Sequence, residues 1–505
     1  MDTNASSRKK PYSLNLLFSY LRKAFIEEKM NNLVGYTTLG ILCFLVVFII
    51  SKVGVLAGII LGVIFIGIPI VFLGLLNIRF GFICALFIAF FLFHFNRMIG
   101  KYDLQTGVLI ELFFITSTVG ILFGKKRNPH YLKQLTNPVS FMVLAFFVFY
   151  LAQAFNPNAT SLSGWLFILR GAIGVVLIYI ISMNIFSSLE FVKTFTKFWF
   201  FLALLAAIYG IYQEVFGFTE FENRWIYSSE QSFRLAFIWG RFRRMSFLSD
   251  AASFGIFMSY TGIAALIFSM GPYSTKKRIF AFISGVLMLI SMNFSGTRTA
   301  YAAVPVGLGL FMLMSANNRR TVIFSIILSL SFIVILFGPF HSSALTRLRS
   351  TFETEEDASF IVRENNRHGI QPYMMDHPMG GGIATTGLMG VRLSPKHPLA
   401  NFPTDSGMVK TALEMGWIGL LIEYGMFFTV LTMGIIYYFK VKNLIIKNLY
   451  LMYLACFFAM TIANFAQVAL GQRPMNILFY ATFALVIKLK DIDDELNEKN
   501  ETPST

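Results

Sequence analysis

Residues 165–186 read WLFILRGAIGVVLIYIISMNIF. The stretch is almost entirely apolar, and it exceeds the length of about 20 residues that an α-helix needs to cross the hydrocarbon core of a bilayer. Its one charged side chain, Arg170, would be costly in contact with lipid, and such residues usually face a pathway or a buried partner. Glu214, at the end of the next apolar stretch, is a candidate partner. The stretch predicts a membrane-spanning helix that carries an ionisable group.

Apolar stretches of this kind occupy most of the chain. Hydrophobic residues make up 56% of the 505 residues and charged residues 13%, against about 45–50% and about 25% in soluble domains. This composition excludes a water-soluble fold and predicts an all-α, polytopic membrane protein with about fourteen transmembrane helices. The predicted spans are residues 33–50, 54–76, 80–95, 107–123, 139–155, 165–186, 195–216, 250–270, 279–294, 297–314, 321–339, 409–438, 448–466 and 474–489.

The basic residues predict which side of the membrane each loop faces. A net charge of +16 is compatible with a nucleic-acid partner, but no nucleic-acid-binding module is recognisable, and we expect none. Lys and Arg instead gather in short segments between spans, mostly on the side that holds both termini. By the positive-inside rule that side is cytoplasmic.

This topology divides the chain into three parts. Residues 1–32 are expected to form a cytoplasmic, amphipathic N-terminus that lies on the membrane surface. Residues 33–489 form the membrane domain, with two long outer segments at 217–249 and 340–410; the second is a large penultimate periplasmic loop. Residues 490–505 are expected to be a disordered cytoplasmic tail.

The first outer segment, 217–249, interleaves arginines with aromatic residues. This pattern is typical of an amphipathic helix that rests on the outer leaflet as an anchor. A functional interpretation is that Arg243 or Arg244, beside the start of a span, binds an anionic lipid headgroup, because a guanidinium group contacts phosphate oxygens bidentately.

A second arginine stands in the turn between two spans within residues 293–307, which read NFSGTRTAYAAVPVG. Arg298 lies close to the membrane boundary, where an arginine either extends towards water or faces a cavity. The small polar residues on both sides of Arg298 favour a narrow polar pocket.

The second outer segment, 340–410, contains further candidates for chemistry, namely Arg363, Arg367, His397 and Asp405. Three consecutive glycines at 380–382 indicate either a loop whose backbone N–H groups approach a ligand or a flexible turn. Asp405 precedes a long helix and is either a catalytic carboxylate or a helix N-cap. Glu414 is interpreted as a helix-face carboxylate near the outer surface.

Motifs for metal or nucleotide chemistry are absent from the sequence. No HExxH or paired CxxC string occurs, so we expect no metal and no cofactor. P-loop and Gly-x-Ser-x-Gly strings are also missing, which disfavours NTP-driven and serine-hydrolase functions.

Three local patterns resemble the O-antigen polymerase and O-antigen ligase superfamily of bacterial membrane glycosyltransferases. They are RRMSFLSDAASFGIFMSY at 243–260, FSGTRTAYAAVPVG at 294–307, and the region from Arg363 to Leu421, which contains HPMGGGIATTG and TDSGMVKTALEMGWIGLL. One departure concerns the last string. Ligases of the family typically carry a His-Asn pair where this chain has Asp405-Ser406, which favours a polymerase and argues against a simple histidine base.

The resemblance implies a metal-independent enzyme of the bacterial inner membrane that uses an undecaprenyl-diphosphate-linked glycan, with membrane lipids and a chain-length regulator as further partners. It implies polymerisation of repeat units into a surface polysaccharide. Alternatives are a ligase that transfers the glycan to a lipid core or protein and, in another class, a glycolipid or anion transporter. Asp405 is the first candidate for the catalytic base and His397 the second. The arginines implied in diphosphate binding are Arg243, Arg244, Arg298, Arg363 and Arg367.

Overall fold

The computed structural model describes residues 31–53, 68–100, 107–123, 135–238, 240–319, 321–324, 358–404 and 406–501, with a few single residues between these ranges. The chain divides into two compact units, Met1–Leu73 and Gly74–Thr505. The described part of the first unit is dominated by one apolar helix, α2 (Leu33–Val53). Helix α4 (Ile68–Leu76) crosses the boundary between the units.

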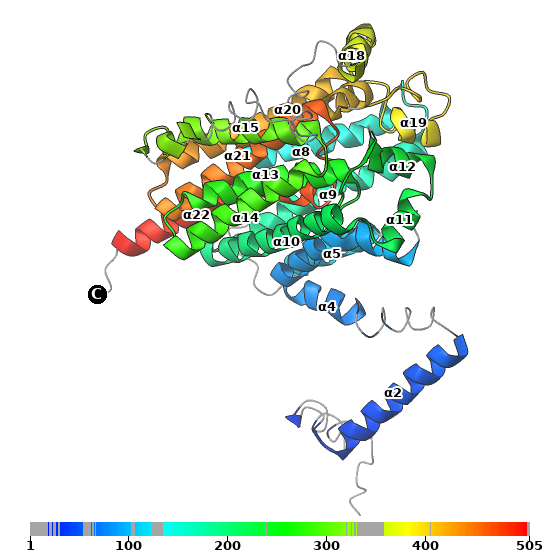
Figure 1. Cartoon of the computed structure of the whole chain (residues 1–505), viewed down its shortest axis with the longest axis vertical. Helices are drawn as coiled ribbons and strands as arrows, with labels where there is room; N and C mark the ends of the chain where they lie inside the picture. Colours follow the sequence, from blue (N-terminus) through cyan, green and yellow to red (C-terminus); the bar gives the residue numbers. More distant parts are fainter. Residues whose placement is uncertain are drawn as a thin grey trace, which may run out of the picture. The chain divides into compact units, whose positions relative to one another are not determined.

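The second unit is a helical bundle (Figure 1). Each predicted span that lies wholly within the described residues coincides with a helix, whereas 54–76 and 321–339 lie partly outside them. The helices are α5 (Ile78–Ile99), α6 (Gly107–Phe123), α8 (Pro138–Ala152) with the 3₁₀ turn η3 (Gln153–Phe155), α9 (Leu162–Ile185), α10 (Leu189–Phe216), α11 (Glu220–Ile226), α12 (Glu230–Ala236), α13 (Ala251–Ser269), α14 (Thr275–Asn293), α15 (Arg298–Met314), α18 (Ala358–Asp376), α19 (Gly387–Leu393), α20 (Gly407–Lys440), α21 (Leu444–Ala466) and α22 (Met475–Glu501).

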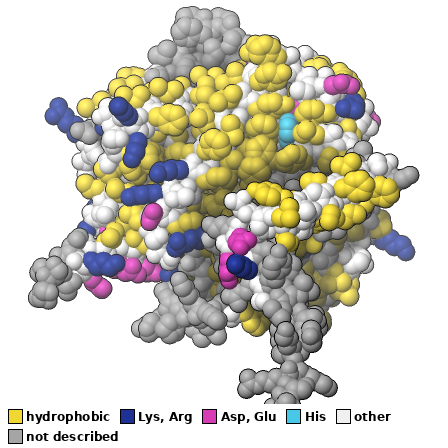
Figure 2. Space-filling model, turned by 90° about the horizontal axis from the view of Figure 1, so that it is seen from below, with side chains coloured by type: hydrophobic (Ala, Val, Ile, Leu, Met, Phe, Trp, Pro, Cys, Tyr) yellow, Lys and Arg dark blue, Asp and Glu magenta, His cyan; other side chains and the backbone are white. Residues whose placement is uncertain are grey.

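The fold is that of an all-α, multi-pass membrane protein. Among the described residues, seven helices are long and apolar enough to cross a membrane: α5, α8 with η3, α9, α10, α13, α20 and α21. Large apolar side chains on these helices are exposed, for example Phe141 at 70% and Phe428 at 69%. Figure 2 shows hydrophobic side chains across the middle of one face, with Lys and Arg gathered on its left. Exposed apolar surface of this extent matches a lipid environment.

Helix α13 is the centre of the bundle and packs against α14, α15 and α21. Small residues allow the backbones to approach closely, as is usual between membrane helices. A Cβ on Gly262 would lie 2.7 Å from Leu289 Cδ2, and a Cβ on Gly307 would lie 3.1 Å from the Ala455 carbonyl oxygen. These glycines therefore determine how tightly the central helices pack.

The contacts of α13 show how its neighbours run. Asn448 Nδ2 donates to the Ile267 carbonyl oxygen and Cys456 Sγ to that of Tyr260, so α13 and α21 are antiparallel. Gly255 lies against Thr297, so the N-terminal ends of α13 and α15 lie together. The N-terminal ends of α13 and α15 and the C-terminal end of α21 consequently share one end of the bundle.

We call this the loop end, because α11, α12 and α19 also lie there, on the right of Figure 1. The tail end is the opposite end, where the C-terminal half of α22 projects. The N-terminal end of α13 and the C-terminal end of α21 are at the loop end, so their other ends are at the tail end. The turn between α13 and α14 and the turn between α20 and α21 therefore belong to the tail end.

Two expectations from the sequence are wrong in detail. Residues 217–249 do not form one amphipathic helix but two short helices, α11 and α12, followed by an antiparallel hairpin of β1 (Phe237–Ile238) and β2 (Arg241–Phe242). Ser229 is the N-cap of α12, so a separate helix begins there after α11 has ended. Gly240 adopts φ +75° in the turn of the hairpin. The expected disordered tail is instead helical as far as Glu501, and the carboxylate of Asp493 accepts bonds from the backbone N–H groups of Lys442 and Asn443.

Candidate functional site

Arg243 joins two of the segments that carry the family resemblance. Its Nε donates to the Ser295 carbonyl oxygen at 2.7 Å, and its Nη2 donates to Thr297 Oγ1 at 2.9 Å. The side chain is buried, with 8% exposed, and the backbone N–H of Arg244 donates to the Phe294 carbonyl oxygen. The turn before Arg298 is therefore held in place by the two residues that follow β2.

The neighbouring arginines share one carboxylate at the end of α10. Arg244 Nε lies 2.8 Å from Glu214 Oε2, and Arg241 bonds the other oxygen of Glu214. Arg244 also lies over the ring of Phe218, 4.9 Å from its centroid. Two guanidinium groups face one carboxylate here, so the cluster has an excess of positive charge.

Arg298 is the first residue of α15 and is half-buried at the loop end. The C-terminal end of α21 lies at the same end, and there Asn464 contacts Gly407, the first residue of α20. Arg367 of α18 lies over the ring of Phe465, 4.2 Å from its centroid. The structure thus brings Arg243, Arg298 and Arg367 to one end of the bundle.

Helix α20 is broken at Gly416, whose φ of +69° and ψ of −176° are not helical. The glycine segment Gly380–Gly382 bonds to the carbonyls freed by this break. The backbone N–H of Gly381 donates to the Leu413 carbonyl oxygen at 2.8 Å, and that of Gly382 donates to the Glu414 carbonyl oxygen at 3.0 Å.

This arrangement corrects two interpretations of the sequence. The N–H group of Gly380 donates to the His377 carbonyl oxygen, so all three N–H groups of the glycine segment bond within the protein and the segment is not a ligand loop. Glu414 does not lie on the surface. Its side chain is 5% exposed and accepts a bond of 2.6 Å from Thr386 Oγ1.

Side-chain amides after α8 hold the other edge of the glycine segment. Gln153 Nε2 and Asn156 Nδ2 donate to the Met379 carbonyl oxygen at 3.0 and 2.9 Å, and Asn158 Nδ2 donates to that of Gly380 at 3.1 Å. Sequence analysis missed these residues. The available signal was a group of amides at the end of an apolar span, where polar groups need partners.

His397 lies inside the 358–406 region and is 6% exposed. Its Nδ1 accepts a bond of 3.1 Å from the backbone N–H of Leu399, and its ring is close enough to Gly381 that a Cβ there would lie 2.6 Å from His397 Cε1. Burial lowers the pKa of His397, partly opposed by a hydrogen bond to the backbone of Asn158. A neutral imidazole enclosed in this way connects the loop to the glycine segment.

Asp405 and the side chain of Arg363 lie outside the described residues. The residue after Asp405 is the N-cap of α20, because Ser406 Oγ accepts a bond from the backbone N–H of Val409 at 3.3 Å. Ser406 therefore performs the capping function that was one of the two interpretations of Asp405.

A second cluster of charge lies between α6, α9 and the turn before α22. Glu111 Oε1 lies 3.1 Å from Arg170 Nε and 3.1 Å from Arg473 Nη2. The suggested pairing of Arg170 with Glu214 is therefore wrong. Glu214 and Arg170 lie on helices that the sequence cannot place relative to each other.

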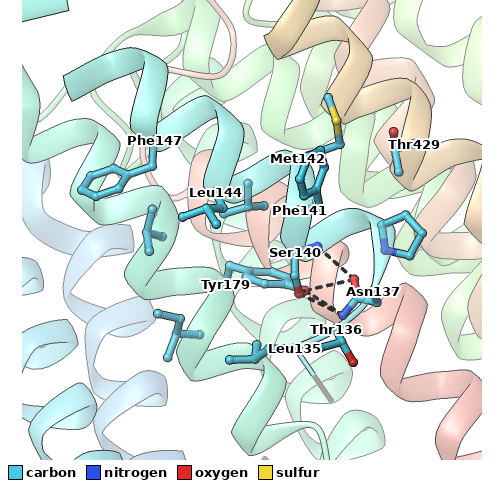
Figure 3. A pocket seen from close by; sticks show the side chains of 14 residues that line it. Leu135, Thr136, Asn137, Ser140, Phe141, Met142, Leu144, Phe147, Tyr179 and Thr429 are labelled. Carbon is cyan, nitrogen blue, oxygen red and sulfur yellow. Dashed lines mark hydrogen bonds between the residues drawn. The ribbon is translucent and has the colours of Figure 1, made fainter. Parts of the chain in front are cut away.

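A cavity of about 770 Å³ lies nearer the tail end, between α8, α9 and α20. Figure 3 shows Asn137, Ser140 and Tyr179 at its polar corner and Phe147 on its apolar wall. Ser140 Oγ and the Tyr179 hydroxyl lie 2.6 Å apart. Since this cavity contains none of the candidate arginines, it is separate from the site at the loop end.

One comparison with known proteins found a match, and it covers part of this region. Residues 283–423 match the family model described as O-antigen ligase. This match is consistent with the O-antigen polymerase and ligase superfamily. The match begins within α14 and ends within α20, so it includes the turn before Arg298, the glycine segment and the break at Gly416. A search of curated proteins found no match to the chain.

Members of this family are glycosyltransferase-like enzymes that act on polyprenyl-linked glycans. The family match broadly supports a function of the O-antigen ligase or polymerase type, and the apolar helices indicate a multi-pass membrane protein. Among the described residues, no group of three His, Cys, Asp or Glu side chains is placed to hold a metal ion.

Proposed function

We propose that the protein polymerises undecaprenyl-diphosphate-linked oligosaccharide repeat units into a surface polysaccharide, without a metal cofactor. The reaction would occur on the outer face of the bacterial inner membrane, with the loop end outward and both termini cytoplasmic. Figure 2 supports this orientation, because Lys and Arg gather on the side where the C-terminus lies in Figure 1, as the positive-inside rule requires.

The convergence of the three family-like segments at the loop end is the observation that carries the proposal. Arg243 bonds to the turn at Ser295 and Thr297, and the glycine segment bonds to the break in α20. The first two segments are therefore joined directly, and the third lies at the same end of the bundle, where Gly407 contacts Asn464 of α21. A leaving diphosphate needs such preorganised positive groups as charge develops on it.

We assign separate roles to the arginines, and the role of Arg243 follows from its contacts. Arg243 positions the turn, since its guanidinium donors are directed at protein oxygens. Arg298 and Arg367, with Arg363 and Arg244, bind the diphosphate. Bidentate bonding by guanidinium groups suits this task better than the single ammonium group of lysine.

In the proposed step an acceptor hydroxyl attacks the anomeric carbon of the donor glycan. The new C–O bond forms as the bond to the diphosphate breaks, and the electron pair leaves with the diphosphate. The hydroxyl proton passes to the carboxylate of Asp405. His397, although a candidate base from the sequence, has its Nδ1 occupied by Leu399 and is assigned to positioning the loop.

A ligase is the second candidate, because the matching family model carries that description. It would use the same donor but transfer the finished glycan to a lipid core or to protein. A transporter has less support. Among the described arginines, Arg79, Arg97 and Arg170 lie in candidate spanning helices. Arg79 and Arg97 are near the two ends of α5, and Arg170 is paired with Glu111. Alternating access through the membrane would require more polar groups along the path.

Glycan analysis in a deletion strain tests the proposal. The strain is complemented with the wild-type chain, Arg298→Ala, Asp405→Asn or the control Arg392→Ala, which removes an exposed arginine from α19, and membrane expression is confirmed. A polymerase predicts that single repeat units accumulate on lipid in the deletion, Arg298→Ala and Asp405→Asn strains, while Arg392→Ala restores polymer.

Other outcomes separate the alternatives. Long lipid-linked chains that are not transferred would identify a ligase and refute polymerisation. Normal polymer in the Asp405→Asn strain would remove the proposed base, and normal polymer in the deletion strain would refute glycosyl transfer altogether. A chain-length regulator belongs to the same proposal, and its absence should alter the length of the polymer but not its formation.

A further inference from the structure

A cavity of about 480 Å³ opens at the tail end, between the N-terminal halves of α10 and α14 and the start of α21. This volume lies within the range of small-ligand sites, about 300–1,000 Å³. The cavity lies at the opposite end of the bundle from Arg243 and Arg298. It is lined by the N-terminal half of α10, whereas the C-terminal end of α10 leads into residues 217–249 at the loop end. It is therefore independent of the proposed glycosyltransferase site.

Three lysines line the cavity: Lys193 and Lys197 from α10 and Lys277 from α14. No Asp or Glu is among the lining residues, and none of the three lysines forms an ion pair with the described residues. Lys193 is half-buried and the other two are exposed. The rim of the cavity is thus a concentration of positive charge without a counter-charge from the described protein.

The interior of the cavity is aromatic and apolar. Phe268 and Tyr273 stack with ring centroids 4.0 Å apart and form one wall. Phe201 and Phe280 are 56% and 63% exposed on the outside of the bundle, so the cavity continues into the surface that faces lipid. An apolar chain can enter from the bilayer without crossing a polar barrier.

Two polar side chains that line the cavity lack a hydrogen-bond partner or a capping bond. The hydroxyl of Tyr273 is buried and has no hydrogen-bond partner among the described residues. Ser274 is the N-cap of α14, and its side chain makes no capping bond. A buried hydroxyl without a partner is destabilising, and an oxygen-rich ligand in the cavity would supply the missing acceptor.

We propose that this cavity binds an anionic phospholipid, with its phosphate among Lys193, Lys197 and Lys277 and one acyl chain in the aromatic interior. Basic pockets between membrane helices bind anionic lipid headgroups in this way. The phosphate accepts bonds from the lysine ammonium groups and from the Ser274 and Tyr273 hydroxyls. Charge complementarity selects an anionic lipid, and the apolar opening selects a lipid over a soluble phosphate.

The test uses the full chain, purified in a neutral maltoside detergent. Dioleoyl phosphatidylglycerol is titrated against a constant amount of dioleoyl phosphatidylcholine, and binding is followed by native mass spectrometry and by the rise in Tm. The variant is the triple substitution Lys193→Gln, Lys197→Gln and Lys277→Gln. The matched control, Lys276→Gln, Lys440→Gln and Lys499→Gln, removes the same charge from exposed positions outside the cavity.

We expect the cavity variant to bind phosphatidylglycerol on the order of a hundredfold more weakly, at about 1 kcal/mol for each lysine near an anionic lipid. The control should lose less than threefold, and replacing the same three lysines by arginine should retain binding. The lysines are at the rim, so the fold should survive, and a monodisperse elution profile checks this.

Three results would overturn the proposal. Equal weakening in the cavity variant and the control would mean only general attraction to an anionic surface. Equal binding of phosphatidylcholine and phosphatidylglycerol would remove the role of charge. If inorganic phosphate raised the Tm as much as phosphatidylglycerol does, the cavity would be a site for soluble anions. None of these readouts depends on glycosyl transfer.

Discussion

Substituting Gly416 by alanine should be among the most damaging single changes in the molecule. Its φ of +69° and ψ of −176° fall in a region that is essentially restricted to glycine and costs other residues about 1–3 kcal/mol. A Cβ would also lie 2.0 Å from the Pro378 carbonyl oxygen and 2.5 Å from the Gly380 nitrogen. The glycine segment would have to move away from the break in α20.

The loss of stability follows from these contacts. Moving the segment weakens the bonds it donates to the carbonyls of Leu413 and Glu414, each worth about 0.5–1.5 kcal/mol. Together with the backbone strain, the total is about 2–6 kcal/mol. For a chain of this length a change of 1 kcal/mol corresponds to roughly 1–2 °C in Tm, so Tm should fall by roughly 2–12 °C.

The assay is the Tm of the purified full chain in detergent, measured for Gly416→Ala and for the control Gly309→Ala. Gly309 lies in α15 with open space around its Cβ position, and alanine is favoured over glycine in a helix by up to about 1 kcal/mol. The control should therefore be as stable as the wild type or slightly more stable. Equal Tm values for the two variants would refute the assignment of Gly416 as an obligatory break.

Three further predictions concern the charged and buried groups of the loop end. Arg243→Ala should lower stability by about 2–5 kcal/mol because two charge-assisted bonds are lost, and Arg243→Lys should restore less than half of it, as judged by Tm and by yield from membranes. Glu111→Gln should cost roughly 1–3 kcal/mol in thermal unfolding, less than a fully buried pair, because Arg170 is 39% exposed and solvent screens it. Burial lowers the pKa of His397 from 6.5, so its contribution to stability is present above pH 6.5 and is lost as pH falls below it. When the pH is lowered from 7.5 to 5.0, the Tm of the wild type and of the control His368→Gln should fall further than the Tm of His397→Gln.

The membrane spans could be predicted from the sequence because bilayer thickness alone sets the length of an apolar helix. The short structure at 217–249 could not, because its ends depend on local features such as the caps of α11 and α12 and the hairpin at Gly240. The break in α20 was hidden for a related reason. The sequence of residues 409–438 predicts one unbroken span. The break is visible only in the φ and ψ of Gly416 and in its contacts with Pro378 and Gly380.

The candidate site was predictable in its residue types but not in its pairings. Arginines near a membrane boundary indicate an anionic ligand whichever helices carry them. Their partners depend on which helices are neighbours, which is tertiary information. For this reason Arg170 was paired with Glu214, whereas the packing of α9 against α6 gives it Glu111. The amides Gln153 and Asn156 were overlooked because their partners are backbone carbonyls, which no sequence motif marks.

The balance of charge at the loop end explains why this end suits a diphosphate. Glu214 faces both Arg241 and Arg244, and in the second cluster one carboxylate likewise faces two guanidinium groups. Each cluster pairs its carboxylate with two guanidinium groups, so each has one positive charge more than it has negative charges. The first cluster lies next to Arg243 in the chain, and Arg243 bonds to the turn before Arg298. Under the proposed function, positive groups at that end would attract the anionic donor before any single contact forms, and groups already held in position would stabilise the charge that develops on its leaving group.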